Sequence, residues 1–354
     1  MSDRRVHRPV VLAFAAALAL ALLPGSASAA ARSTRPPGLV QAGNSKTTCI
    51  YAPLGAPMRQ AMAATGIHFQ CVEVFATEDP SWRAWTRPWV IAPQYGYTRW
   101  LAADPTGRTV ILTINLVPDN VAKSPTWRAV GASGAYDAYA RALARNLVAA
   151  GFGSSVIRLG PEMNGPWEAD WIGTTPAQWG AWAAYFARIV RSMRSVPGAH
   201  FLFDWNVNAG YKVIPLASFY PGNAYVDIVG IDAYDESPIT LPPVGSPSRW
   251  TVLTTEPLGL DEIYAFARAH GKPASLPEWG TISIHGDDGA YVENMGRFVA
   301  THVVAYQAWY DVGDNNILPL NAKQAPRSLA AYVAAFGPRS PVARYQQLFV
   351  AGRG

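Results

Sequence analysis

The sequence predicts an α/β fold, a single (β/α)₈ TIM barrel. Short, nearly continuous apolar runs recur along the chain, amphipathic helical patterns separate them, and eight such units fit into roughly 300 residues. This alternation is typical of a parallel sheet covered by helices. Eight units favour a closed barrel over an open doubly wound sheet. No G-x-G-x-x-G fingerprint follows the first run, which disfavours a dinucleotide-binding fold.

The N-terminal part of the chain predicts export. Residues 1–31 have the pattern of a cleavable signal peptide: basic residues, the apolar stretch Val10–Leu23 and then small residues. The apolar stretch is shorter than the roughly 20 residues that span a bilayer, so an uncleaved membrane anchor is the less favoured alternative. We expect residues 32–45 to form a short linker and residues 46–354 the barrel domain of a secreted protein.

The charge of the chain argues against a nucleic-acid partner. The formal net charge is +5 over 354 residues. Removing the predicted signal peptide takes away three arginines and one aspartate, which leaves about +3. No run of lysine or arginine survives, whereas nucleic-acid binding requires a basic stripe. No later segment predicts a membrane span.

Cys49 and Cys71 are the only cysteines. Both lie near the ends of what we expect to be adjacent strands, and an exported protein meets an oxidising environment. We therefore expect a Cys49–Cys71 disulfide, with two buried free thiols as the alternative.

The apolar runs give the expected strands. They are Thr48–Tyr51, Phe69–Phe75, Thr109–Asn115, Ser155–Leu159, His200–Trp205, Val226–Asp232, Ala274–Glu278 and Val303–Trp309.

Helical patterns lie between the expected strands. One begins after Thr175-Pro176, an N-cap followed by proline. Its apolar stripe includes Trp179 and Trp182, for which we expect core packing. Two further helices are expected to end at Gly151 and Gly271, since glycine readily adopts the left-handed conformation that closes a helix.

Two glutamates at strand ends are the candidate catalytic residues. Glu162 follows the fourth expected strand and Glu278 ends the seventh, each beside glycine, proline and tryptophan. Chemistry in a parallel barrel lies where the strands enter the following loops. Paired carboxylates there can transfer protons and attack an anomeric carbon, and indole faces stack on sugar rings. The alternative is that each glutamate has only a structural role, in a salt bridge.

Four segments resemble glycoside hydrolase family 26, which is best known for β-mannanases. Arg158–Gly173 (RLGPEMNGPWEADWIG) is similar to the family's acid/base segment, and Leu276–Gly280 (LPEWG) to its nucleophile strand. Phe203–Asn208 (FDWNVN) and Tyr220–Asp235 (YPGNAYVDIVGIDAYD) resemble the fifth and sixth strands. The resemblance extends from about residue 46 to residue 336.

The resemblance implies a retaining double displacement. Glu162 would be the proton donor and acid/base, and Glu278 the nucleophile. Tyr234 matches a tyrosine that hydrogen-bonds the nucleophile. Arg158 matches an arginine four residues before the acid; we expect it to face the barrel interior, either at the substrate or supporting the floor.

Two positions depart from the family pattern. Pro161 occupies the place of a histidine just before the acid, and Asn223 the place of an aspartate. Because that histidine shapes the site around the cleaved sugar, the proline puts mannan specificity in doubt more than catalysis.

Polar and aromatic residues near the strand ends are the candidate substrate-binding set. They are Arg158, Asn164, Trp167, Trp171, Trp205, Tyr234, Trp279 and Trp309.

Other acids near the strand ends are not expected to be catalytic, and they are Glu168, Asp170, Asp204, Asp232 and Asp235. Asp287-Asp288 predicts a helix-capping loop rather than a cation site. No histidine pair has metal-ligand spacing, and no G-x-S-x-G elbow is present, which disfavours metal-dependent and serine hydrolases.

Together these features predict a secreted, endo-acting β-glycanase that hydrolyses β-1,4-mannan. We expect it to work as a monomer, with no metal and no cofactor, on a polysaccharide or oligosaccharide. A β-1,3/1,4-glucanase or xylanase of the same fold is an alternative. A non-catalytic carbohydrate-binding or exopolysaccharide-handling protein is another, which Pro161 keeps open.

Overall fold

The computed structural model of the chain describes residues 44–77, 80–211, 214–313 and 317–343. The predicted signal peptide, residues 1–31, and nearly all of the predicted linker lie outside the described residues.

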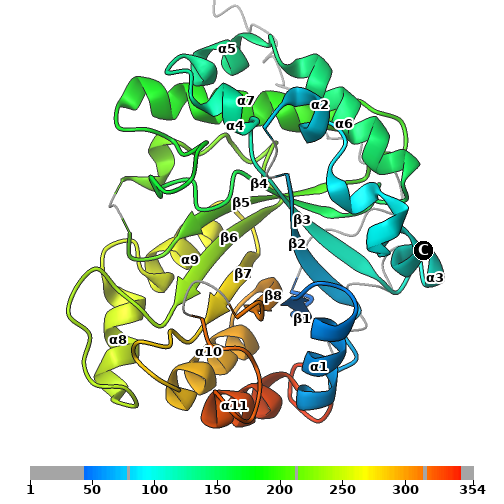
Figure 1. Ribbon diagram of the computed structural model, residues 1–354. Coiled ribbons are helices and arrows are strands. Elements are labelled where there is room, and N and C mark those ends of the chain that lie inside the picture. Colours follow the sequence, from blue (N-terminus) through cyan, green and yellow to red (C-terminus); the bar gives the residue numbers. More distant parts are fainter. Residues whose placement is uncertain (1–43, 78–79, 212–213, 314–316, 344–354) are drawn as a thin grey trace, which may run out of the picture. The chain divides into compact units, whose positions relative to one another are not determined.

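Eight parallel strands pair in chain order, and the eighth pairs with the first to close a barrel. Figure 1 shows these strands at the centre of the helices. Their bounds are β1 Thr47–Tyr51, β2 Cys71–Thr77, β3 Thr109–Ile114, β4 Val156–Leu159, β5 Leu202–Asn208, β6 Ile228–Tyr234, β7 Ala274–Gly280 and β8 Val304–Tyr310.

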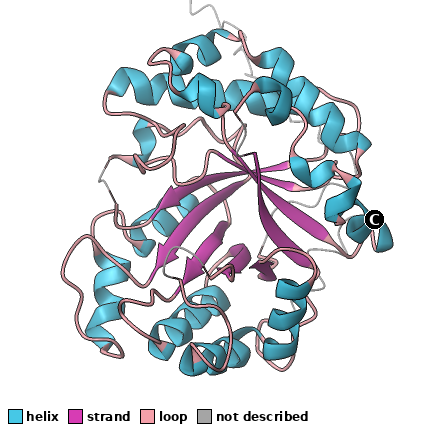
Figure 2. Cartoon of the chain, viewed as in Figure 1, coloured by secondary structure: helices cyan, strands magenta, loops and turns pink. Residues whose placement is uncertain are grey.

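Helices connect the strands and surround the barrel, as the colouring in Figure 2 makes clear. The α-helices are α1 Ala56–Thr65, α2 Trp82–Trp85, α3 Tyr97–Ala103, α4 Asp119–Ala122, α5 Trp127–Ser133, α6 Asp137–Ala149, α7 Pro176–Arg194, α8 Pro247–Thr255, α9 Leu260–Ala269, α10 Gly289–Thr301 and α11 Pro326–Phe336. The 3₁₀ helices are η1 Trp89–Ile91, η2 Pro93–Tyr95 and η3 Leu216–Ser218.

The predicted (β/α)₈ barrel is confirmed, and each expected strand corresponds to an observed one. The expected bounds of β2 and β6 are two residues too early, and those of β5 are two residues too early at its start and three at its end. Strands β5 and β6 continue into polar residues. Asn206 and Asn208 of β5 and Asp232 and Tyr234 of β6 remain in regular strand geometry. In a closed barrel, successive residues alternate between the helix layer and the interior. These polar residues occupy interior positions, so a polar side chain does not end the strand.

Side chains inside the barrel change from apolar to polar along its axis. At the N-terminal end of the strands a small cluster is apolar and buried, and it includes Ile111, Val156, Leu202 and Ile228. One or two residues further along the strands, buried polar side chains take their place. The interior is therefore an apolar plug beneath a polar layer, which is the layer that faces the barrel mouth.

Cys49 of β1 and Cys71 of β2 form a disulfide within this apolar plug. Both side chains are almost completely buried. The expected pairing is present, and the free-thiol alternative is excluded.

Local signals explain where the main helices begin. Thr175 forms a capping box with Gln178 at the start of α7, and Pro176 occupies the first turn. The Asp288 carboxylate accepts the backbone N–H of Tyr291 at the start of α10, as the helix-capping prediction requires. No helix in the described ranges combines the length and apolarity that crossing a bilayer requires.

We expect the Cys49→Ala/Cys71→Ala double variant to be less stable than wild type by about 3 kcal/mol. The disulfide closes a loop with a sequence separation of 22 residues, which restricts the unfolded chain. Urea unfolding monitored by tryptophan fluorescence measures the difference. An unchanged unfolding midpoint would show that the bond does not stabilise the barrel.

Candidate active site

Arg158 of β4 lies at the centre of the polar layer and is completely buried. One terminal nitrogen, Nη1, bonds Glu278 and also contacts Glu73 at 3.3 Å. The other, Nη2, bonds Asp232 and donates to the Asn206 amide oxygen at 2.9 Å. One guanidinium thus joins strands β2, β4, β5, β6 and β7 beneath the barrel mouth.

Glu278 lies within β7, next to an irregularity in the strand. The register between β7 and β8 shifts between Leu276 and Trp279, a bulge that redirects the intervening side chains. One Glu278 oxygen is bonded by Arg158, and the other accepts the Tyr234 hydroxyl at 2.9 Å. The Glu278 backbone N–H also donates to Asp232 at 3.1 Å. Glu278 is therefore held on both oxygens and at its backbone.

Glu162 lies in a tight turn beyond the end of β4, not in the strand itself. Gly160 has φ of +64°, and a Cβ there would lie 2.3 Å from a Leu116 methyl group, so only glycine fits. Glu162 itself has φ of +40°, in the left-handed region that costs a non-glycine residue roughly 1–2 kcal/mol. Its backbone N–H donates to the Asn206 amide oxygen at 2.7 Å. This turn brings the carboxyl group over the barrel mouth.

The Glu162 carboxyl group accepts one donor on each oxygen. The Asn208 amide donates to Oε1 at 2.5 Å, and the Trp167 indole N–H donates to Oε2. Burial, followed by the negative charge of Glu278, raises the pKa of Glu162 to about 7, while the Asn208 hydrogen bond acts in the opposite direction. This carboxyl group can therefore hold a proton near neutral pH.

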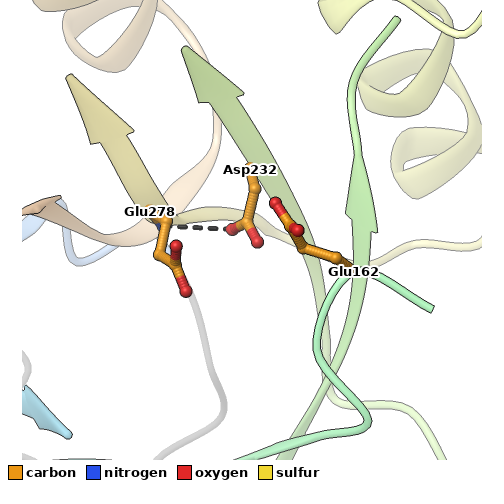
Figure 3. Close-up of side chains that lie close together, drawn as sticks. All are labelled: Glu162, Asp232 and Glu278. Carbon is orange, nitrogen blue, oxygen red and sulfur yellow. Dashed lines mark hydrogen bonds between the residues drawn. The ribbon is translucent and has the colours of Figure 1, made fainter. Parts of the chain in front are cut away.

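Glu162, Asp232 and Glu278 point toward one another (Figure 3). One oxygen from each lies within 4.8 Å of the other two. Three such oxygens could in principle bind a cation, but Arg158 already bonds both Asp232 and Glu278. The charge that a metal would supply is thus provided by a guanidinium, and we assign no metal site here.

Three other strand-end acids, Asp204, Asp235 and Asp170, have structural partners. Asp204 accepts hydroxyl groups from Ser275 and Tyr306, and Asp235 pairs with Arg249. Asp170, beyond β4, accepts the backbone N–H of Leu116. Of the strand-end acids considered from the sequence, Asp232 is the one that lies beside both glutamates.

The prediction that Trp205, Trp279 and Trp309 stack on sugar rings is wrong. All three are fully buried and point into the helix layer. Trp205 lies between the inward-facing Asp204 and Asn206, so strand alternation turns it outward.

Aromatic and backbone groups outside the barrel interior enclose these three indoles. Trp205 packs on Phe266 of α9, and Trp279 on Phe336 of α11. Trp309 donates its indole N–H to the backbone of Leu318. Their large faces are therefore unavailable to a sugar.

Two polar residues of the predicted binding set, Arg158 and Asn164, face protein groups. For Arg158 this agrees with the second of its two expected roles, support of the floor, whereas the prediction that Asn164 binds substrate is wrong. Arg158 is enclosed by protein groups, and Asn164 is fully buried. The Asn164 side chain bonds the backbone of Asn208 in both directions and the carbonyl of Tyr211. It fixes the end of β5, and Arg158 supports the floor of the site.

Trp167 and Trp171 remain candidates for substrate contact. Trp167 is 49% exposed beside Glu162, and its ring lies edge-on to Tyr211. Trp171 is half-buried against the main core.

The sequence interpretation missed Glu73, Asn206 and Asn208. A signal for them exists: Glu73 is the charged residue within the apolar run CVEVFA. On β5, Asp204, Asn206 and Asn208 are polar at every second position. A polar period of two inside a buried parallel strand indicates a polar barrel interior.

Comparisons with known proteins agree with the fold. Residues 139–241 match the family described as Glycosyl hydrolase family 26. A search of curated proteins finds no match.

Solved structures with the same fold include three glycosidases. A modular endo-β-1,4-mannanase from Cellulomonas fimi has a TM-score of 0.57 and 17% identity, covering 84% of this chain and 72% of the mannanase. A family 26 β-mannanase from Bacteroides ovatus has a TM-score of 0.59 and 14% identity, covering 87% and 94%. A broad-specificity endoglucanase from Clostridium longisporum has a TM-score of 0.51 and 14% identity, covering 84% and 87%.

A closed (β/α)₈ barrel with adjacent glutamates at its mouth, together with the family match, places this chain among the glycoside hydrolases. The resemblance to family 26 that the sequence motifs indicated is confirmed.

We expect Trp205→Ala to lower the free energy of unfolding by about 3–5 kcal/mol, because it leaves a large cavity between β5 and α9. Trp167→Ala should change it by less than about 1 kcal/mol, since that ring is half exposed. Urea unfolding of both variants provides the comparison. Similar losses in the two variants would contradict the assignment of Trp205 to the core.

Proposed function

We propose that this protein is a secreted, retaining endo-β-glycanase in which Glu162 is the acid/base and Glu278 the nucleophile. We further propose that its substrate is β-1,4-mannan. The observation that carries the proposal is the approach of the Glu162 and Glu278 oxygens to within 4.8 Å. Retaining glycosidases hold their two carboxyl groups about 5–5.5 Å apart, whereas inverting enzymes need about 6.5–9.5 Å to admit a water molecule.

The two glutamates differ in the way that a double displacement requires. Glu162 has a raised pKa, so it can protonate the glycosidic oxygen as the bond to the anomeric carbon breaks. Glu278 is bonded by the Arg158 cation and by Tyr234, which supports an ionised carboxylate that attacks that carbon. Glu162 then removes a proton from the water that releases the sugar from Glu278.

The surroundings of the pair support an uncharged glycan as substrate. The guanidinium beside the pair is buried and bonded to carboxylates, so it offers no site for an anionic sugar. Exposed Trp167 beside the acid would supply an aromatic face. The similarity to two mannanase structures favours mannan, and the similarity to the endoglucanase favours β-glucan as the second candidate.

Export is part of the same proposal. The Cys49–Cys71 disulfide is typical of a protein that folds in an oxidising compartment, and the N-terminal sequence has the signal-peptide pattern.

We expect Glu278→Ala to reduce kcat/KM on mannan by about 10⁴-fold or more, because no nucleophile remains. Glu162→Ala should lose about 10²–10⁴-fold on the polysaccharide. It should lose much less in the first step with an activated aryl glycoside, whose leaving group needs little protonation. Reducing-end release and burst kinetics measure the two effects.

Glu293→Ala provides a matched control, because this glutamate lies exposed on α10. It should behave as wild type. Small and equal losses in the Glu162 and Glu278 variants would contradict the assigned roles. Release of the product with inverted anomeric configuration, seen by proton NMR, would contradict the retaining mechanism. A panel of mannan, lichenan, xylan and microbial exopolysaccharide tests the substrate.

The pH profile should follow the ionisation of Glu162. The acid form is required, so kcat/KM should fall as the pH rises through about 7. Asn208→Ala removes a donor that favours the carboxylate, which should raise the pKa of Glu162 and move this limb to higher pH. Asn223→Ala, an exposed asparagine before β6, should leave the limb in place. A shift to lower pH in Asn208→Ala would contradict this account.

A further inference from the structure

Glu73 is a buried acid that the proposed mechanism does not use. It lies inside the barrel on β2 and is 1% exposed. Its Oε1 accepts the Thr113 hydroxyl at 3.0 Å and faces Arg158 Nη1 at 3.3 Å. Its Oε2 is buried with no hydrogen-bond partner in the described part of the chain.

The charges around Arg158 do not balance if every acid is ionised. Glu73, Asp232 and Glu278 all lie within 4.0 Å of one guanidinium, with side chains that are at most 9% exposed. Three buried carboxylates on one cation would leave two uncompensated charges in a medium of low dielectric, which is very unfavourable. At least one of the three must hold a proton.

The hydrogen bonds identify which acid that is. Asp232 accepts three donors: Arg158, the Asn206 amide and the Glu278 backbone N–H. Glu278 accepts Arg158 and Tyr234, one donor on each oxygen. Burial, together with the negative charges of nearby acids, also raises the pKa of Asp232 well above its ordinary value. The donors on both Asp232 oxygens nevertheless stabilise its ionised form, and we give this geometry the greater weight.

Glu73 has far weaker support for a negative charge. Its contact with Arg158 exceeds the 2.7–2.9 Å that is usual for a charge-assisted hydrogen bond. Among the residues that the structure describes, none donates to its second oxygen. Leaving a buried anionic oxygen without a donor is costly, and protonation removes the charge.

We propose that Glu73 holds a proton in the folded protein and acts as a positioning residue. Its neutrality leaves the charge of Arg158 to Asp232 and Glu278. Under the proposed function, this helps to keep the nucleophile ionised while Glu162 is protonated. Only this last consequence depends on the proposed function; the proton on Glu73 does not.

Other groups that face Glu73 also influence its pKa. Asp204 of β5 and Glu278 raise the pKa of Glu73, Arg158 and Thr113 lower it, and burial is the largest influence. The result is a pKa of about 8. The Tyr306 hydroxyl of β8, also in this layer, donates to Asp204.

The decisive experiment is urea unfolding of the full-length, oxidised protein at several pH values between 5 and 8. It compares wild type, Glu73→Gln and, as the matched control, Asp232→Asn. Glutamine has nearly the shape of a neutral glutamic acid and, like it, is uncharged with one carbonyl oxygen and a donor group. No substrate is involved, so the result is independent of whether the protein is a mannanase.

The sign of the expected effect follows from linkage. Between the unfolded pKa of about 4.3 and the folded pKa, wild type holds one more proton at Glu73 when folded than when unfolded. The free energy of unfolding of wild type therefore falls as the pH rises. Glu73→Gln has no proton to lose at this position, so its free energy of unfolding lacks this pH dependence. The unfolding equilibrium constant of wild type, divided by that of Glu73→Gln, should rise by close to tenfold per pH unit from pH 5 to 7.

A ratio that stays constant with pH would overturn the proposal, because Glu73 would then be ionised in both states. The same ratio can be formed with Asp232→Asn in place of Glu73→Gln. If only the ratio with Asp232→Asn rises with pH, the proton belongs to Asp232, and the proposal is overturned. Failure of Glu73→Gln to fold at pH 5 would contradict the neutral state that glutamine reproduces. Infrared difference spectra provide a second measurement: wild type at pH 6 should show a protonated-carboxyl C=O band that Glu73→Gln lacks.

Discussion

The site depends on a single buried guanidinium. Arg158 bonds or contacts side chains from four other strands, including both carboxylates nearest Glu162. Burying such a group is favourable only when its hydrogen bonds are largely satisfied by fixed partners. The barrel supplies them by turning polar residues inward at every second position, so the same alternation that closes the fold also builds the floor of the site.

Small residues make room for this floor. Gly230 of β6 faces the interior, where a Cβ would lie 2.5 Å from an Asp204 oxygen and 3.0 Å from the Asn206 amide nitrogen. Its lack of a side chain allows two polar groups of β5 to lie against β6. The polar layer leaves no room for a side chain at this position, and any enlargement at Gly230 would displace Asn206, which bonds Arg158.

The fold and the two glutamates could be predicted from local patterns, but the partners of each side chain could not. Strand alternation was visible in the sequence, yet the strand-end tryptophans were assigned to the mouth when their parity places them in the helix layer, as Trp205 shows. The position of Glu278 also depends on a bulge, and that of Glu162 on a left-handed backbone. Neither feature has a reliable sequence signature beyond the nearby glycine and proline, because each arises from tertiary packing.

The two glutamates are carried by different kinds of backbone. Glu278 lies within a strand, whereas Glu162 is carried by a short turn with an unfavourable φ. Each is nevertheless held at its backbone N–H and on both carboxyl oxygens. The strained turn persists because these surrounding contacts over-determine it. The gap between the two carboxyl groups is therefore set by the protein itself, and a ligand that enters does not have to bring them together.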